Sequence, residues 1–219
     1  MLGFCLLCPA SLASMQLIGI WAVIAATLGP IQNITGWSLS AFLWPEYDPI
    51  RQTISDLAAD DSPVKWVQTS FFLFGSTLTL IGAWHAKSLA MPGRVTLFLA
   101  GLSSYGVAIF AVPDQTSNSP QHLFFATTYF LLFSAWPLLA MRFDRRYHWS
   151  IRPPGAISAT AVMSIATLVF LLTWLDPDRS VTGLAQRAIV VMQVSWLTFA
   201  VWAQWLHQRK YLGSVVNQT

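Results

Sequence analysis

Charged residues are scarce in this sequence. Asp, Glu, Lys and Arg together make up 10% of its 219 residues, against roughly 25% in soluble domains. This shortage excludes an ordinary soluble fold, and the 55% of hydrophobic residues predicts a polytopic membrane protein instead. We expect an all-α fold in which residues 1–219 form a single membrane domain.

Cysteine is nearly absent, because Cys5 and Cys8 are the only two thiols. Two cysteines without histidines at ligand spacing form neither a disulfide framework nor a zinc site, so we predict no metal and no cofactor. The eleven tryptophans need none either, since an aromatic belt near the ends of membrane spans explains them. Residues 1–14 lack a basic n-region and a cleavage pattern, so no cleaved signal peptide is expected and Met15 is an alternative start.

Basic clusters of the kind that bind nucleic acid are also lacking. The net charge is +3, but the Lys and Arg residues lie in short connectors, where they set the orientation of a membrane protein. We therefore expect no nucleic-acid partner. Membrane lipids are the expected partners, with a membrane-protein partner as the alternative.

Uncharged runs long enough to cross a bilayer recur along the chain. Two of them follow Ser-Pro pairs at Ser62 and Ser119, which combine a capping side chain with a proline in the first helical turn. The first run is expected to stop or bend near Pro30. The resulting six predicted transmembrane helices cover about 16–31, 63–84, 95–112, 121–141, 153–175 and 184–206.

One polar stretch, residues 44–62, interrupts this pattern, and we call it the island. It contains five of the nine acidic residues of the chain, namely Glu46, Asp48, Asp56, Asp60 and Asp61. Thr53 and Asp56 have the spacing of a capping box, which predicts a short helix that begins near Thr53.

The charges divide the connectors into two sets. Connectors 85–94, 142–152 and 207–210 hold eight of the twelve Lys and Arg residues and one acid, Asp144. Because Lys and Arg are retained on the cytoplasmic side, we predict an inner (plasma) membrane protein with both termini cytoplasmic. The island, the connector around Asp114 and the connector 176–183 then face outward.

The outward side gathers the residues that could carry chemistry. Asp114 and His122 flank one short connector, and a carboxylate beside an imidazole is a usual pair of orienting group and base. With Ser55 they predict a catalytic set for nucleophilic attack, whereas with further carboxylates such as Asp56 they could hold a metal. No spacing resembles a known zinc or nucleophile-elbow motif, and the alternative for His122 is a satisfied polar group at the interface.

Two residues of the last span are candidate ligand contacts together with Asp56. Arg187 lies one turn into this span, where an arginine snorkels to headgroups or pairs with an outer carboxylate. Gln193 falls near the middle of the membrane and must face another helix or a cavity. Hydrogen bonding between helices is the more common role of such a glutamine, and contact with a ligand is the other.

Three segments resemble the prokaryotic membrane-protein family catalogued as domain of unknown function 998. YDPIRQTISDLAADDSP resembles its ISxL hallmark, and VPDQTSNSPQH resembles its connector from FP-D to His, with Val112 in place of phenylalanine. GLAQRAIVVMQVSW resembles its closing segment, in which Gln186 replaces a glutamate. The resemblance covers nearly the whole chain from Met15, and it implies six helices but no established activity.

These observations favour one functional hypothesis over two others. The first is an outward-facing polar pocket that binds a lipid or other amphiphile, with a polar head near the charged groups and a tail between helices, and that hydrolyses or remodels it if the site is catalytic. The rival is a non-catalytic subunit or assembly factor of a larger membrane complex. A small-molecule transporter is third, because no acidic residue or histidine lies near mid-membrane and no inverted repeat is detectable.

Overall fold

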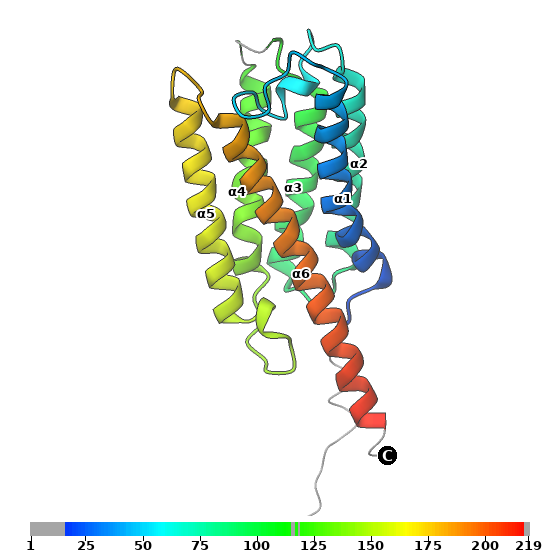
Figure 1. The fold of residues 1–219 in the computed structure, drawn as a ribbon. Coiled ribbons are helices and arrows are strands. Elements are labelled where there is room, and N and C mark those ends of the chain that lie inside the picture. The colour runs from blue at the N-terminus through cyan, green and yellow to red at the C-terminus, as the bar shows by residue number, and fades with distance from the viewer. Residues whose placement is uncertain (1–15, 115–116, 118, 217–219) are drawn as a thin grey trace, which may run out of the picture.

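A computed structural model describes residues 16–114, 117 and 119–216. Within them it contains six long helices and no strand (Figure 1). The helices are α1 (Ile20–Phe42), α2 (Lys65–His85), α3 (Met91–Ile109), α4 (Pro120–Leu139), α5 (Pro153–Leu175) and α6 (Thr182–Val216), with short 3₁₀ helices η2 (Asp56–Ala58) and η3 (Trp149–Ile151). The predicted all-α bundle of six helices is confirmed. Cys5, Cys8 and Met15 lie outside the described residues.

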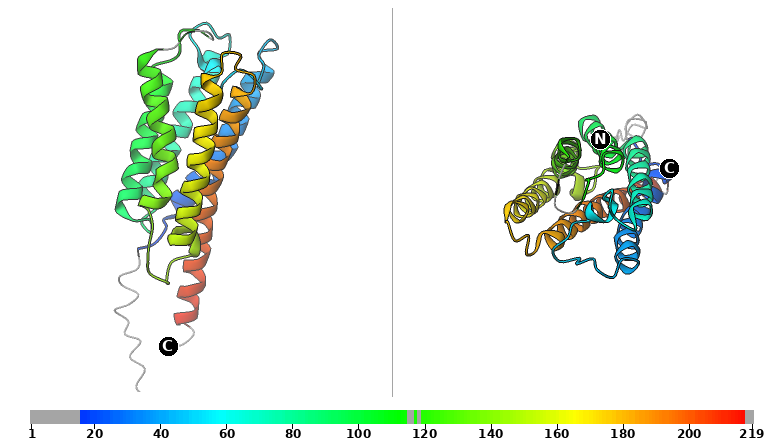
Figure 2. Two further views of the ribbon diagram at one scale, coloured as in Figure 1. Left: turned by 90° about the vertical axis from the view of Figure 1, so that its left-hand side faces the viewer. Right: turned by 90° about the horizontal axis from the view of Figure 1, so that it is seen from above.

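The six helices run side by side, and their connectors gather at two opposite ends (Figures 1 and 2). One end, which we call the island end, carries the island and the connectors that follow α3 and α5. The other, the basic end, carries the connectors that follow α2 and α4, together with the start of α1 and the end of α6. The two sets of connectors that differ in charge therefore lie at opposite ends of the molecule.

Helix α6 crosses the bundle obliquely, so that it contacts α5 near the island end and α1 near the basic end (Figure 1). Near its start, Thr182 Oγ1 donates a hydrogen bond to the Thr173 carbonyl at 2.7 Å. Toward its end, Gln208 Oε1 accepts a hydrogen bond from the Ile18 N–H at 3.1 Å. These contacts fix a helix that leaves α5 as it approaches the basic end.

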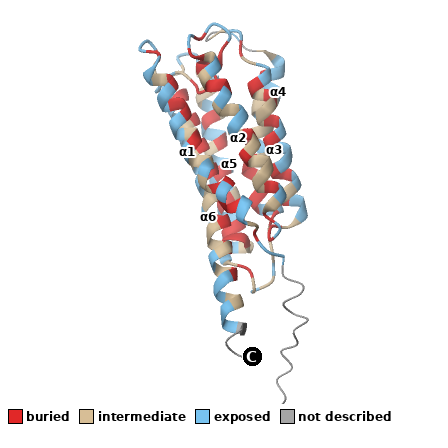
Figure 3. Ribbon diagram, turned by 90° about the vertical axis from the view of Figure 1, so that its right-hand side faces the viewer, coloured by how far each residue is buried: buried red, intermediate tan, exposed pale blue. Residues whose placement is uncertain are grey.

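Three of the helices, α4, α5 and α6, are long and apolar enough to cross a membrane by their length and composition. On α5 the large apolar side chains Ile157, Val162, Ile165 and Leu172 are exposed, while buried residues follow the inner face of the bundle (Figure 3). Such an apolar outer surface is typical of a helix that faces lipid. Helices α1, α2 and α3 bury hydroxyl and amide side chains among their apolar residues, for example Gln32, Ser40, Gln68, Thr69, Ser76 and Ser103.

The first helix differs from its prediction, because it does not end near Pro30 but continues to Phe42. Pro30 has no N–H to donate to the carbonyl of Ala26 one turn earlier. Thr198 Oγ1 of α6 donates to this carbonyl at 2.6 Å instead. A neighbouring helix thus satisfies the freed backbone group, which allows the helix to continue inside a membrane.

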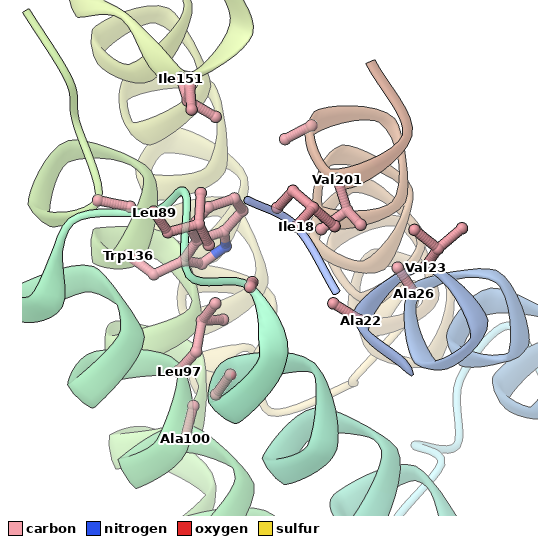
Figure 4. Close-up of a cluster of buried hydrophobic side chains, with 14 of the residues drawn as sticks. Ile18, Ala22, Val23, Ala26, Leu89, Leu97, Ala100, Trp136, Ile151 and Val201 are labelled. Carbon is pink, nitrogen blue, oxygen red and sulfur yellow. The ribbon is translucent and has the colours of Figure 1, made fainter. Parts of the chain in front are cut away.

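Two apolar cores hold the bundle together. In the core at the basic end, Trp136 of α4 lies beside Leu89 and Leu97, while Ala22 of α1 faces Val201 of α6 (Figure 4). The second core packs the island onto α4, α5 and α6, and its buried members include Tyr47, Ile54, Leu57, Phe130, Phe170 and Ile189. This second core places the island directly over the helices that carry the predicted site residues.

Candidate functional site

The island folds around one reciprocal cap. The Thr53 N–H donates to Asp56 Oδ2 at 2.7 Å, and the Asp56 N–H donates to Thr53 Oγ1 at 3.2 Å. The predicted capping box is therefore present, although the helix that follows it is the single turn η2. Asp56 is only 4% exposed, and burial raises the pKa of its carboxyl group above the ordinary 3.8, against the lowering effect of the hydrogen bonds to Thr53.

Arg187 holds the island from the second turn of α6. Its Nη1 donates to the carbonyl oxygens of Pro49 at 2.8 Å and Gln52 at 3.1 Å, and its Nη2 donates to the Tyr47 hydroxyl. Burial raises the pKa of Tyr47 to about 12 although Arg187 lowers it, so the hydroxyl stays protonated at neutral pH. Backbone carbonyl groups thus take the place of the carboxylate partner that the sequence suggested for Arg187.

Helix α6 begins directly against the island. The Gly183 N–H donates to the Arg51 carbonyl at 3.2 Å, and a β-carbon at Gly183 would overlap the carbonyl oxygen of Gln52. Only glycine permits this approach of two backbones. Gln186 Oε1 then accepts a hydrogen bond from the Ile54 N–H at 2.6 Å, which adds an acceptor beside Ser55 without adding a charge.

His122 lies in the first turn of α4, where its N–H donates to the capping hydroxyl of Ser119 at 3.0 Å. The residue is 4% exposed, with Nδ1 at 2.8 Å from the Phe110 carbonyl oxygen and Nε2 at 3.1 Å from Ser55 Oγ. A carbonyl oxygen only accepts, so Nδ1 carries the proton, and Nε2 of the neutral ring has a lone pair for the Ser55 hydroxyl. The Ser55 hydroxyl, the His122 imidazole and the Phe110 carbonyl thus stand in the order of a nucleophile, its base and the acceptor that orients the base.

Asp114 does not occupy the place predicted for it. Its Oδ1 accepts from the Ser117 N–H at 2.8 Å and its Oδ2 from the Ser117 hydroxyl at 2.7 Å. The two ring nitrogens of His122 meet Phe110 and Ser55 instead. The expectation that Asp114 orients the imidazole is therefore wrong in this structure, because a backbone carbonyl group fills that role.

Ser55 forms part of the wall of a cavity of about 60 Å³ beneath the island. Asn33, Gln186 and Tyr129 add polar groups to the wall, and the rest is largely apolar: Phe72, Val107, Ala126, Phe130 and Val190. One buried water needs about 10–15 Å³ of such space, so a polar group of a few heavy atoms fits. The sequence analysis did not predict Asn33 and Tyr129 as lining residues, although a polar side chain within an apolar helix can indicate an internal polar site.

A second cavity of about 50 Å³ continues the first toward the basic end. Asn33 and Tyr129 line both spaces, and the second extends along α1 to Ala22. From Asn33 to Ala22 a helix rises about 16 Å. Most of the other lining residues are apolar, among them Phe71, Leu78, Phe133, Val194 and Leu197. Both spaces are mainly apolar with a few polar side chains, and the second adds Gln32 and Thr79 to those it shares with the first.

Gln193 lies outside the lining of both cavities. Its Nε2 donates to the Phe130 carbonyl at 3.2 Å and to Ser134 Oγ at 3.1 Å, and Ser134 is in turn 3.0 Å from Thr167 Oγ1. These contacts connect α6, α4 and α5 inside the bundle. They are the interhelical hydrogen bonds that the sequence offered as one of two roles for this glutamine.

A metal finds no donor set at this site. In the described part of the chain, no group of three or more His, Cys, Asp or Glu side chains could hold an ion. Apart from the His122 imidazole, the polar side chains that line the cavity with Ser55 carry hydroxyl and amide groups, which are weak ligands for a transition metal.

The fold and the site define a class: a helical membrane protein with a polar island packed over two largely apolar internal spaces that share Asn33 and Tyr129. The chain belongs to the family described as "Protein of unknown function (DUF998)", which matches residues 27–203. This agrees with the resemblance drawn from the three sequence segments. Comparisons with curated proteins and with solved structures gave no match.

Proposed function

We propose that the space beneath the island binds a lipid or another amphiphile, and that Ser55 and His122 act on an ester of this molecule. The observation that carries the proposal is the place of Ser55. Ser55 lines the cavity, and its Oγ lies 3.1 Å from His122 Nε2. A nucleophile, its base and a space for the reacting group therefore meet at one point.

The lining supports a ligand whose polar group is small and uncharged. Ser55, Tyr129, Asn33 and Gln186 present neutral hydroxyl and amide groups to the cavity. Arg187 is engaged with the island's carbonyl groups and does not line the cavity. A charged head would lose its hydration there without gaining a counter-charge, whereas an ester, hydroxyl or amide finds hydrogen-bond partners.

The apolar second cavity supports an apolar tail on the same molecule. It lies next to the first and is lined mainly by aromatic and aliphatic side chains of α1, α2, α4 and α6. An amphiphile whose ester lies at Ser55 would extend its first methylene groups into this space. Ligand sites of this kind combine an apolar lining with a few polar groups that fix orientation.

The hydrogen bonds support a two-step hydrolysis. His122 Nε2 would take the proton of Ser55 as Oγ attacks the ester carbonyl carbon, and would return it to the departing alcohol. Water would then release the acyl group from Ser55 with the same base. The Phe110 carbonyl keeps Nδ1 protonated, which leaves Nε2 as the basic nitrogen in both steps.

The distribution of charge supports an outward position for this site. The connectors at the basic end hold eight of the twelve Lys and Arg residues, which favours a cytoplasmic position for that end by the positive-inside rule. The island would then face the outside of the inner (plasma) membrane. The ligand would come from the outer leaflet.

Native mass spectrometry of protein purified from its membrane tests the binding. We expect an amphiphile to be retained, and Ala126→Leu to release it, because the added carbons fill the cavity beside Ser55. Thr127→Leu is the matched control, since Thr127 is exposed on the same helix and does not line the cavity. A wild-type protein without amphiphile but with a stoichiometric protein partner would favour the non-catalytic subunit instead.

A further inference from the structure

The proposed function leaves unused a groove on the side of the bundle toward the basic end. Helices α5 and α6 diverge toward this end (Figure 1). A groove of about 440 Å³ lies between them. Val162 of α5 and Met192, Trp196 and Phe199 of α6 contribute to its lining. Val162 and Met192 are 53% and 43% exposed, so the groove opens to the apolar outer surface of the bundle.

A second space, which we call the compartment, adjoins this groove at Phe199. Phe199 also lines this space of about 470 Å³, whose other residues include His148, His207 and Lys210. Along α6 the rise from Phe199 to Lys210 is about 16 Å. Each of the two spaces falls within the roughly 300–1,000 Å³ of ordinary ligand sites. The apolar groove and the compartment with three nitrogen-bearing side chains thus have Phe199 as a common wall.

The structure orients His148 as a donor in this compartment. Its backbone N–H donates to Gln204 Oε1 at 2.7 Å, which attaches the connector to α6. The Ser150 N–H donates to His148 Nδ1 at 3.2 Å, so in the neutral ring Nε2 carries the proton. The ring of His207 lies beside it, with 5.7 Å between the ring centroids.

The charges around the compartment favour an anion. Asp144 is the only acid in the connectors of the basic end, and its Oδ2 lies 2.6 Å from Arg146 Nη2. Burial, and after it the neighbouring His207, lower the pKa of His148, which favours the neutral ring with its Nε2–H donor. An anion between His148, His207 and Lys210 would accept this hydrogen bond and pair with the Lys210 ammonium.

We propose that this groove binds one anionic phospholipid from the leaflet at the basic end. The phosphate accepts hydrogen bonds from His148, His207 and Lys210, and an acyl chain lies past Phe199 between α5 and α6. A helix of a second protein copy fits less well, because it would cover the cationic compartment without neutralising it. The site is separate from Ser55, which lies at the island end.

Lipid titration of the full-length protein in detergent tests this site. Phosphatidylglycerol and phosphatidylcholine with identical chains are compared by native mass spectrometry. We expect the first phosphatidylglycerol to bind about fivefold more tightly, since one basic residue near an anionic lipid contributes about 1 kcal/mol. Glycerol phosphate, which lacks the chains, should not compete. Displacement of the lipid by glycerol phosphate at equal concentration would overturn the proposal in favour of a free-phosphate site.

Two sets of variants separate the headgroup from the chain. His207→Asn with Lys210→Gln should remove the preference for phosphatidylglycerol, while Lys87→Gln, an exposed lysine outside the compartment, should preserve it. Ser195→Trp should weaken both lipids by narrowing the groove, and Ser158→Trp does the same from the other wall. Every variant is measured as monodisperse protein. Equal binding of both lipids by the wild type, or a preference that survives the double substitution, would refute the site.

Discussion

At the scale of single residues, substitutions of Asp56 allow the stability that its hydrogen bond contributes to be measured apart from the cost of burying its charge. Its carboxylate accepts from the Thr53 N–H, yet burial raises its pKa. Asp56→Ala removes the acceptor and should cost about 1 kcal/mol of stability, as loss of a capping side chain does. Asp56→Asn keeps an acceptor oxygen without the charge, so it should be at least as stable as the wild type at pH 7.

The sign of the pH dependence follows from the raised pKa. The folded protein holds the Asp56 proton more tightly than the unfolded chain does, because the pKa of Asp56 is raised on folding. This tighter binding stabilises the wild type fully below the ordinary pKa of 3.8, and the stabilisation is lost as pH rises through the raised pKa. Thermal unfolding of the wild type and Asp56→Asn between about pH 4 and 8 should therefore diverge as pH increases. An asparagine variant as unstable as Asp56→Ala at pH 7 would contradict this account.

The sequence predicted those parts of the candidate site that consist of side chains, and it missed the part that consists of backbone. Ser55 and His122 stand out as a polar pair in an apolar chain, and the structure brings them into contact across 67 positions. Asp114 was assigned the orienting role because a carboxylate is the usual partner of a histidine. The Phe110 carbonyl that fills the role belongs to the backbone, which has no signature in the sequence.

At the scale of helices, the pairing of α1 with α6 depends on a proline and a threonine. Thr198→Val keeps the side-chain shape but removes the hydroxyl that donates to the Ala26 carbonyl. We expect a loss of about 1–3 kcal/mol, because a buried acceptor is left without a donor. Pro30→Ala restores an N–H that bonds this carbonyl within α1.

A double-mutant cycle in detergent measures this coupling. Thr198→Val should cost less in the Pro30→Ala background than in the wild type, since α1 then satisfies its own carbonyl group. Equal losses of stability in both backgrounds would show that the Thr198 hydroxyl does not replace the N–H that Pro30 lacks.

Helix starts were more predictable than helix ends. The Ser119 cap and the proline that follows it open α4 where the sequence places them, because both signals are local. The end of α1 was not predictable, since the group that rescues Pro30 comes from Thr198, which is 172 positions from the carbonyl it serves. The oblique course of α6, which creates the groove beside α5, likewise depends on contacts between distant segments.

At the scale of the whole molecule, the segregation of charge makes a prediction about topology. Reporter domains fused within residues 142–152 and at the C-terminus should be active on the cytoplasmic side, and a reporter in the island should be active outside. Because Lys and Arg concentrate at one end of the bundle, a reversed result at either basic position would contradict the orientation.

The central claim is that Ser55, activated by His122, faces a space that takes an amphiphile, and an alkyl fluorophosphonate tests it most directly. The account predicts covalent labelling at Ser55, no labelling in Ser55→Ala, and labelling that is about 10²–10⁴-fold slower in His122→Ala, the range typical of a lost general base. Asp114→Asn should label at the wild-type rate, since the Phe110 carbonyl orients the ring. Folded wild-type protein that is not labelled at Ser55, or that is labelled no faster than His122→Ala, would contradict the claim.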